Sequence, residues 1–143
     1  MIDVKMISKA GVKPIYATED SAGIDLPAHI DVTIDIPPFN RRLIPTGLHV
    51  AIPKGHVGLV CPRSGLAIKK GLTVLNAPGI IDGDFRGEIG VILINLSNEV
   101  QSINPGDRIA QLVITKYEKA NFLLTNSLDE TERGSGGFGS TGA

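Results

Sequence analysis

Short apolar runs separated by glycine and proline extend along almost the whole chain, and this regular spacing of turn-forming residues restricts the folds that the chain can adopt. The 143 residues include 17 glycines and 9 prolines, spread between the apolar runs. Residues 31–36 alternate apolar and polar side chains, and residues 2–7 do so as well. Alternation with period two indicates half-buried strands, and glycine and proline mark the turns between them. The sequence therefore predicts an all-β domain, either a sandwich or a barrel.

Charge and cysteine content exclude several classes of function. The formal net charge is −1, so no overall positive field would attract nucleic acid, and we expect no nucleic-acid partner. Cys61 is the single cysteine, which rules out a disulfide framework within one chain and favours a cytoplasmic location. The first residues lack a signal-peptide pattern, no apolar run could span a bilayer, and we expect no membrane partner. The three histidines show no metal-ligand spacing and indicate structural or surface roles.

The most informative stretch is residues 76–95, which begins with turn-forming residues and ends in an apolar strand. Asp82 and Asp84 flank Gly83, and Phe85 follows directly. Asp-Gly between apolar runs favours a β-hairpin, so two carboxylates and a ring should gather on one tight turn. This is a suitable place for a general base. The alternative for Asp-Gly alone is an ordinary surface turn.

A second group of residues suits an anion. Arg63, Ser64 and Gly65 follow an apolar strand and offer guanidinium, hydroxyl and main-chain donors. A short helix over residues 64–70 is expected, capped by Ser64 and ended by Gly71. Gln111 lies within the apolar strand 108–115, and a polar side chain in that position needs a partner.

The glycine-rich tail resembles a phosphate-binding loop in its spacing over residues 134–139. Ser140 occupies the place of the expected lysine, so this is not an ordinary P-loop. A flexible linker is one interpretation, but Phe138 argues against it, because a spacer does not need a ring. We expect a lid that becomes ordered over a phosphorylated ligand.

Five blocks taken together resemble the trimeric dUTP pyrophosphatases (dUTP diphosphatases, or dUTPases). Each block is weakly informative alone, but the five in this order make a specific match that covers nearly the whole chain. They are residues 22–26 (Ala-Gly-Ile-Asp-Leu), 62–65 (Pro-Arg-Ser-Gly), 79–87 (Gly-Ile-Ile-Asp-Gly-Asp-Phe-Arg-Gly), 106–112 (Gly-Asp-Arg-Ile-Ala-Gln-Leu) and 133–142 (Arg-Gly-Ser-Gly-Gly-Phe-Gly-Ser-Thr-Gly).

The resemblance implies a distorted jelly roll of the β-clip type that assembles as a homotrimer. Residues 1–132 would form the catalytic domain, and residues 133–143 a flexible C-terminal arm that closes a neighbour's active site. The reaction would be hydrolysis of dUTP to dUMP and pyrophosphate, which keeps uracil out of DNA and supplies dUMP for dTMP synthesis. The implied cofactor is Mg²⁺, held by the triphosphate and by water rather than by side chains.

The resemblance also assigns roles to residues of this sequence. Asp82 would be the general base that activates water, and Asp25, Asp84 and Arg108 would have structural or water-ordering roles, with Asp25 ordering the waters around Mg²⁺. The phosphate-binding residues would be Arg63, Ser64, Gly65, Gln111, Arg133, Ser135, Gly136, Gly139, Ser140 and Thr141. The uracil and deoxyribose would be bound by Asn76, Gly79, Ile80, Ile81, Asp82, Phe85, Gly90 and Phe138. Phe85 stands where the family usually has tyrosine. Phenylalanine keeps the steric exclusion of a 2′-hydroxyl but lacks the phenol hydroxyl.

Three alternatives are weaker. A related dCTP deaminase would need a glutamate at the position of Ile92, and the run of residues 90–94 (Gly-Val-Ile-Leu-Ile) has none. A nucleic-acid-binding barrel would need a basic groove and stacking aromatics, but aromatic residues are 4% of the chain. A non-enzymatic relative would be expected to have lost a catalytic position, and every inferred position is present.

Overall fold

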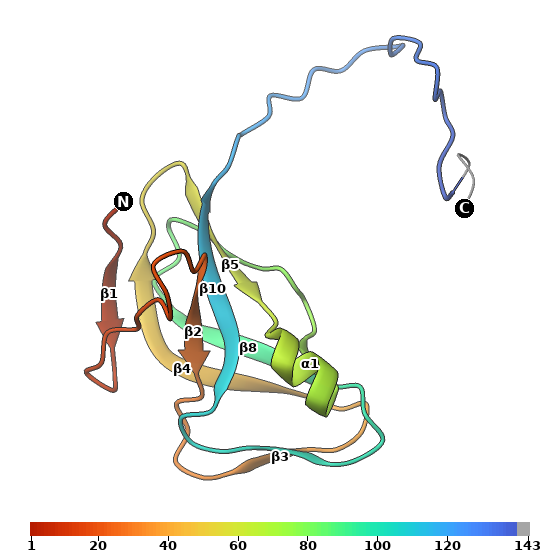
Figure 1. The fold of residues 1–143 in the computed structure, drawn as a ribbon. Coiled ribbons are helices and arrows are strands. Elements are labelled where there is room, and N and C mark those ends of the chain that lie inside the picture. The colour runs from red at the N-terminus through yellow and green to blue at the C-terminus, as the bar shows by residue number, and fades with distance from the viewer. Residues whose placement is uncertain (140–143) are drawn as a thin grey trace.

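The computed structural model describes residues 1–139 and contains eleven regular elements in that range. In chain order they are β1 (Lys5–Ser8), β2 (Gly23–Pro27), β3 (Ile34–Ile36), β4 (Arg41–Ala51), β5 (His56–Cys61), α1 (Ser64–Lys70), β6 (Leu72–Val74), β7 (Gly79–Ile81), β8 (Glu88–Asn95), β9 (Gln101–Ile103) and β10 (Arg108–Lys116) (Figure 1). The predicted all-β class is confirmed, with one short helix.

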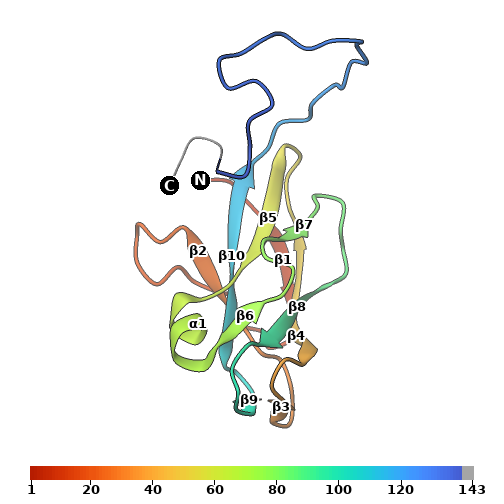
Figure 2. The same cartoon turned by 90° about the vertical axis from the view of Figure 1, so that its right-hand side faces the viewer.

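The strands form two four-stranded sheets, both antiparallel throughout. The first sheet has the order β1-β4-β8-β6 and the second has the order β2-β10-β5-β7, while β3 and β9 form a separate pair. Consecutive strands therefore lie in different sheets, which is consistent with the jelly roll that the resemblance implies. Figure 2 shows β10, β5 and β7 next to one another in that order, with α1 lower in the view beside β6.

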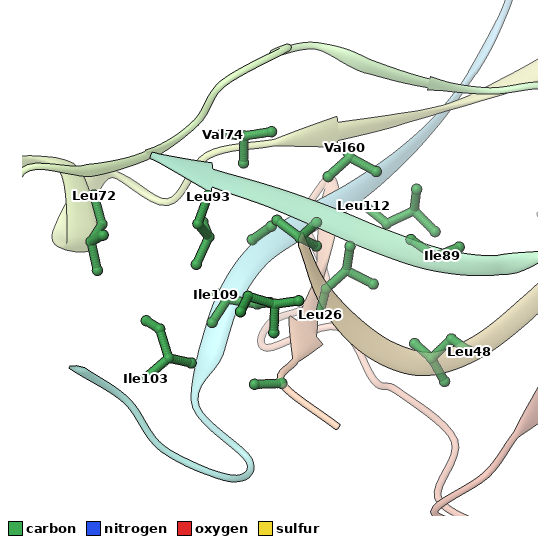
Figure 3. Packing of buried hydrophobic residues seen from close by; sticks show 14 of the residues in the cluster. Leu26, Leu48, Val60, Leu72, Val74, Ile89, Leu93, Ile103, Ile109 and Leu112 are labelled. Carbon is green, nitrogen blue, oxygen red and sulfur yellow. The ribbon is translucent and has the colours of Figure 1, made fainter. Parts of the chain in front are cut away.

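The core lies between the two sheets and is built from the inward side of each strand (Figure 3). Strand β8 alternates half-buried and buried residues along its entire length, which is the pattern of a strand with one face toward a core. Asn95 is buried as well, but its amide donates to the carbonyl of Ile36 at 2.8 Å and of Glu99 at 2.7 Å. Its polar atoms are therefore satisfied, as a buried amide requires.

Two local predictions about turns between strands were wrong. Residues 79–95 do not form a two-stranded hairpin, because β7 pairs with β5 in the second sheet and β8 pairs with β4 and β6 in the first. Pro45-Thr46-Gly47 by sequence favours a turn between two strands, but it is a bulge within the single strand β4, where the pairing register shifts between Pro45 and His49. Gly47 has φ +70° at this bulge, a value that favours glycine.

Helix α1 ends as predicted but does not begin as predicted. Gly71 is in the left-handed conformation at the C-terminus, and its N–H bonds the carbonyls of Ala67 and Leu66. At the other end the capping position is Arg63, and Ser64 is the first helical residue with no side-chain cap bond. The Ser64 hydroxyl is therefore not used by the helix.

After β10 the chain leaves the two sheets (Figures 1 and 2). Residues 117–139 contain no helix or strand, and the apolar side chains of Phe122, Leu123, Leu124 and Leu128 are largely exposed. None of the helices in the described range is long and apolar enough to cross a membrane.

Candidate active site

Asp82 lies on a tight turn that follows β7. The Phe85 N–H donates to the Asp82 carbonyl at 3.2 Å, and the Arg86 guanidinium donates to the carbonyls of Gly83 at 2.7 Å and Phe85 at 2.8 Å. These bonds close the turn on itself and leave the carboxylates of Asp82 and Asp84 exposed. The predicted turn is confirmed, although it connects two sheets rather than two paired strands.

A cavity of about 790 Å³ opens beside this turn. Asp82 and Ile80 line it, and Tyr117 and Lys119 reach it because the Tyr117 N–H bonds the Gly55 carbonyl at 3.2 Å. The complete lining is Ile52, Lys54, His56, Val57, Ile80, Asp82, Gly83, Asp84, Arg86, Tyr117 and Lys119. The start of the C-terminal segment thus belongs to the same region as the candidate base.

Several predicted base- and sugar-binding residues are close to Asp82 in the chain and tightly packed. Gly79 is closely packed, since a Cβ there would lie 3.3 Å from the Asn76 amide nitrogen and from Val60. The Phe85 ring lies against Gly87, where a Cβ would be only 2.5 Å from its tip. Gly90 is in β8 opposite Pro45, covered by Leu43, and it does not line this cavity.

The predicted phosphate-binding residues form a second cluster. The Asp25 carboxylate accepts from Arg63 Nε at 2.9 Å and from an Arg108 guanidinium nitrogen at 3.1 Å. Arg63 also donates to the Arg108 carbonyl at 3.1 Å. Asp25 therefore fixes two guanidinium groups side by side, each still partly exposed and able to meet an anion.

Gln111 has the partner that the sequence required. Its side-chain nitrogen donates to the Pro62 carbonyl at 2.9 Å, directly before Arg63. Gly23 on the neighbouring strand makes room for this amide, since a Cβ there would lie 2.6 Å from Gln111 Oε1. A cavity of about 610 Å³ is lined by Asp25, Arg63, Ser64, Gly65, Arg108 and Gln111, together with Ala17, Ser21, Ala22, Gly23, Cys61 and Val113.

The two clusters occupy opposite ends of β5 and share no lining residue. Ile81 pairs with Gly58 near the beginning of that strand, so Asp82 lies at its first end. Ser64 follows its last end. Six residues of extended strand span about 17 Å, which is more than a water or a phosphate group can bridge. One copy of the chain does not bring Asp82 and Ser64 together.

The C-terminal residues form a small turn of their own. Arg133 Nε donates to the Gly136 carbonyl at 2.9 Å, and the Gly136 N–H donates back to the Arg133 carbonyl at 3.1 Å. Phe138 is fully exposed with φ +52°. Ser135 and Gly139 line neither cavity, and Ser140 and Thr141 lie outside the described residues.

Sequence reasoning missed a cluster on the first sheet. Glu88 pairs with Lys9 and accepts from the Gly47 N–H at 2.8 Å. The hydrogen bond from Lys9 lowers the pKa of Glu88, burial acts in the opposite direction, and the Gly47 N–H and the charges of Lys9 and His49 lower it further. His49 Nδ1 contacts the Arg86 carbonyl at 3.0 Å. The alternating sequence around His49 carried no signal for this contact.

Comparison with known proteins decides the family. The family model described as dUTPase matches residues 10–142. The chain belongs to the dUTPase family. A curated relative from Fusobacterium nucleatum subsp. nucleatum, called deoxyuridine 5′-triphosphate nucleotidohydrolase, is 52% identical over 142 residues, covering 99% of this chain and 97% of the relative. A relative of the same name from Finegoldia magna is 48% identical, covering 97% and 98%.

Solved dUTPase structures share the fold. The dUTPase of Staphylococcus bacteriophage 80alpha, a mutant solved with dUpNHpp, matches with a TM-score of 0.86 and 26% identity over the full length of both chains. A mutant dUTPase from phage phi11 of S. aureus, described with a structural Mg(II) ion, matches with a TM-score of 0.77 and 24% identity, covering 90% of this chain and all of that one. The predicted family and the jelly-roll fold are therefore confirmed.

Proposed function

We propose that the chain hydrolyses dUTP to dUMP and pyrophosphate, with Asp82 as the general base. The observation that carries the proposal is an exposed carboxylate, held on a self-closed turn at the edge of a cavity. The names of the curated relatives and the analogue bound to the phage enzyme support the substrate. Such an enzyme keeps uracil out of DNA and supplies dUMP, and the unpaired Cys61 suits a reducing, cytoplasmic setting.

Asp82 would take a proton from the water that attacks the α-phosphorus. A carboxylate within hydrogen-bond reach of a water suits general base catalysis. The remaining work is positioning and charge stabilisation, because phosphoryl transfer needs little further covalent chemistry from the protein. Asp84 points from the same turn and would help to order water there.

The cluster at the other end of β5 would hold the phosphates. Arg63 is already oriented by Asp25, and the unused Ser64 hydroxyl and the Gly65 N–H are free to face an anion. Gln111 would keep the loop in place through the Pro62 carbonyl. Arg108, the second guanidinium on Asp25, would have a structural role.

The separation of the two clusters favours an active site built between copies of the chain. A closed ring of three copies would repeat one head-to-tail contact, and each contact could join the Asp82 end of one copy to the Ser64 end of the next. Residues 133–143 would then act as a lid on a neighbour, with phosphate donors on Arg133, Ser135, Gly136, Gly139, Ser140 and Thr141. Phe138, exposed in the single chain, would stack on uracil.

Specificity would come from the packed backbone around the turn. Asn76 and the main chain of Gly79, Ile80, Ile81 and Gly90 would read the uracil edge. This backbone would leave no space for the methyl group of thymine. Phe85 would pack on the deoxyribose and exclude a 2′-hydroxyl.

Mg²⁺ is the proposed cofactor, supported by the ion described for the phi11 enzyme. Within residues 1–139 no group of three or more His, Cys, Asp or Glu side chains could hold a metal, and Asp25 already accepts from two arginines. This donor set fits an ion carried by the triphosphate and its waters, with Asp25 as a partner for those waters. When bound, the ion neutralises charge on the triphosphate.

Pyrophosphate release with Mg²⁺ from dUTP, dCTP, dTTP and UTP tests the proposal directly. We expect turnover of dUTP alone, and Asp82→Asn should lower kcat by about 10²- to 10⁴-fold with little change in KM. Full activity in the variant would place the base elsewhere. Turnover of dCTP with release of ammonia would favour a deaminase instead.

A further inference from the structure

The turn that carries Asp82 and Phe85 is closed by its own hydrogen bonds, and one side chain from elsewhere holds it. His49 Nδ1 contacts the Arg86 carbonyl at 3.0 Å. Of the side-chain hydrogen bonds formed by residues 1–139, this is the one that connects residues 82–87 to another part of the chain. A carbonyl only accepts, so the histidine nitrogen donates.

The histidine is itself firmly placed. It lies on β4 just after the bulge and pairs with Glu88, the first residue of β8. Glu88 accepts from the Gly47 N–H within the bulge and from the ammonium of Lys9, which lies in the turn after β1, and the Lys9 N–H donates to the Gly47 carbonyl at 2.8 Å. Three segments thus converge on one carboxylate beside His49. These contacts hold the backbone of β4 at His49, from which the ring reaches the turn.

The held carbonyl is close to the sugar-selecting ring. Arg86 follows Phe85 directly, and its guanidinium bonds the Phe85 carbonyl at 2.8 Å. The Phe85 ring lies on Gly87, the residue after the held carbonyl. A small displacement of the Arg86 backbone would therefore move the Phe85 backbone and Gly87, and with them the position of the Phe85 ring.

We propose that His49 is a positioning residue that fixes the Asp82–Gly87 turn and thereby sets the selectivity for deoxyribose over ribose. This inference rests on the proposed function, in which Phe85 excludes the 2′-hydroxyl. His49 does not touch substrate; it acts through the Arg86 carbonyl.

Two histidine variants separate a lost hydrogen bond from a general loss of packing. His49→Ala removes the donor, whereas His49→Asn keeps an N–H close to the position of Nδ1. A matched control is Thr33→Ala, which removes an exposed 2.8 Å hydrogen bond to Asn104, next to the two-stranded pair of β3 and β9. All three proteins are compared with the wild type by hydrogen exchange of the peptide that contains residues 82–87, and by kcat/KM for dUTP and UTP.

We expect His49→Ala to accelerate exchange in this peptide about fivefold and to lower the dUTP-to-UTP ratio of kcat/KM by a similar factor, mainly through better use of UTP. His49→Asn should restore both values to within about twofold of the wild type. Thr33→Ala should change neither.

Unchanged exchange and unchanged selectivity in His49→Ala would overturn the inference, as would an Asn variant as defective as the Ala variant. A wild-type protein that hydrolyses no dUTP would refute the proposed function and the selectivity claim with it. The exchange measurement does not depend on activity, so it would still decide whether His49 holds the turn.

Discussion

Asp25 and Asp82 are the same residue type used in opposite ways at the two ends of β5. Both oxygens of Asp25 accept from arginine, and its side chain is 31% exposed. No side-chain hydrogen bond in residues 1–139 involves the Asp82 carboxylate, although its backbone carbonyl closes the turn. A carboxylate paired with two cations is suited to aiming them at an anion. A carboxylate with a fixed backbone and free oxygens is suited to accepting a proton.

If each active site joins the Asp82 end of one copy to the Ser64 end of another, two inactive variants, each changed at one end, should regain activity when they are mixed. Asp82→Asn and Ser64→Ala should each lose at least about a hundredfold in dUTP hydrolysis as pure proteins. Unfolded together in equal amounts and refolded, they should regain activity in about a quarter of the sites, since sites between copies then combine one intact end from each. Pyrophosphate release measures the recovery.

Each variant refolded alone is the control for that mixing experiment. A mixture no more active than its parents would mean that both ends serve one site within a single copy, against the separation seen along β5.

Breaking the ion pairs of Asp25 with Arg63 and Arg108 should affect substrate binding more than the chemical step. Asp25→Asn removes the negative charge that orients Arg63 and Arg108, so KM for dUTP should rise about tenfold while kcat changes less. The partly exposed pairs should add no more than about 1 kcal/mol to folding stability, because solvent screens them. Steady-state kinetics and thermal melting check both statements.

Asp35→Asn is the matched control, since Asp35 accepts a hydrogen bond from Ser102 at 2.6 Å in the distant β3–β9 pair. A smaller KM effect in the Asp25 variant than in this control would remove the positioning role of Asp25.

Replacing Glu88 should have the smallest effect of these changes. Its carboxylate stabilises the fold through Lys9 and the Gly47 N–H, rather than aiming a cation or accepting a proton. Its pKa is lowered in the folded protein, first by the Lys9 hydrogen bond, so its stabilising contribution is present above the ordinary glutamate value of about 4.3 and is lost as pH falls through the folded value. The wild type should therefore exceed Glu88→Gln in melting temperature at about pH 6, and the difference should shrink towards about pH 3. A difference that grew on acidification would contradict the assignment.

Much of the fold and most of the chemistry could be predicted from the sequence, because both depend on local patterns. Alternation predicted strands over residues 2–7 and 31–36, and the structure has strands at Lys5–Ser8 and Ile34–Ile36. Gly71 ended the helix, and Gln111 had the partner that a polar side chain in an apolar strand needs. The sequence predicts Ile80, Asp82 and Asp84 of the first cluster, and Asp25, Arg63, Ser64, Gly65, Arg108 and Gln111 of the second. Their roles remain predictions, since the structure places them but does not show them acting.

The wrong predictions arose where one local sequence is compatible with two different backbone structures. A Pro-Thr-Gly segment suits a turn or a bulge, and only the register with β8 decides between them. Asp82-Gly83 suits a hairpin or a crossover, and the choice depends on β5, some twenty residues earlier in the chain. The His49 contact joins residues 37 positions apart, so neither alternation nor composition near His49 could reveal it.

The bulge in β4 has a consequence for how the strand can change in length. Pro45 faces Gly90 and His49 faces Glu88, so four steps along β4 are matched by two along β8. The excess is even, and side chains alternate with period two, so Ile44 and Val50 both point into the core across the irregularity. Losing two residues here would merely straighten the strand. Deleting one residue would reverse the orientation of every later side chain in the strand, so that His49 would point inward and Val50 outward.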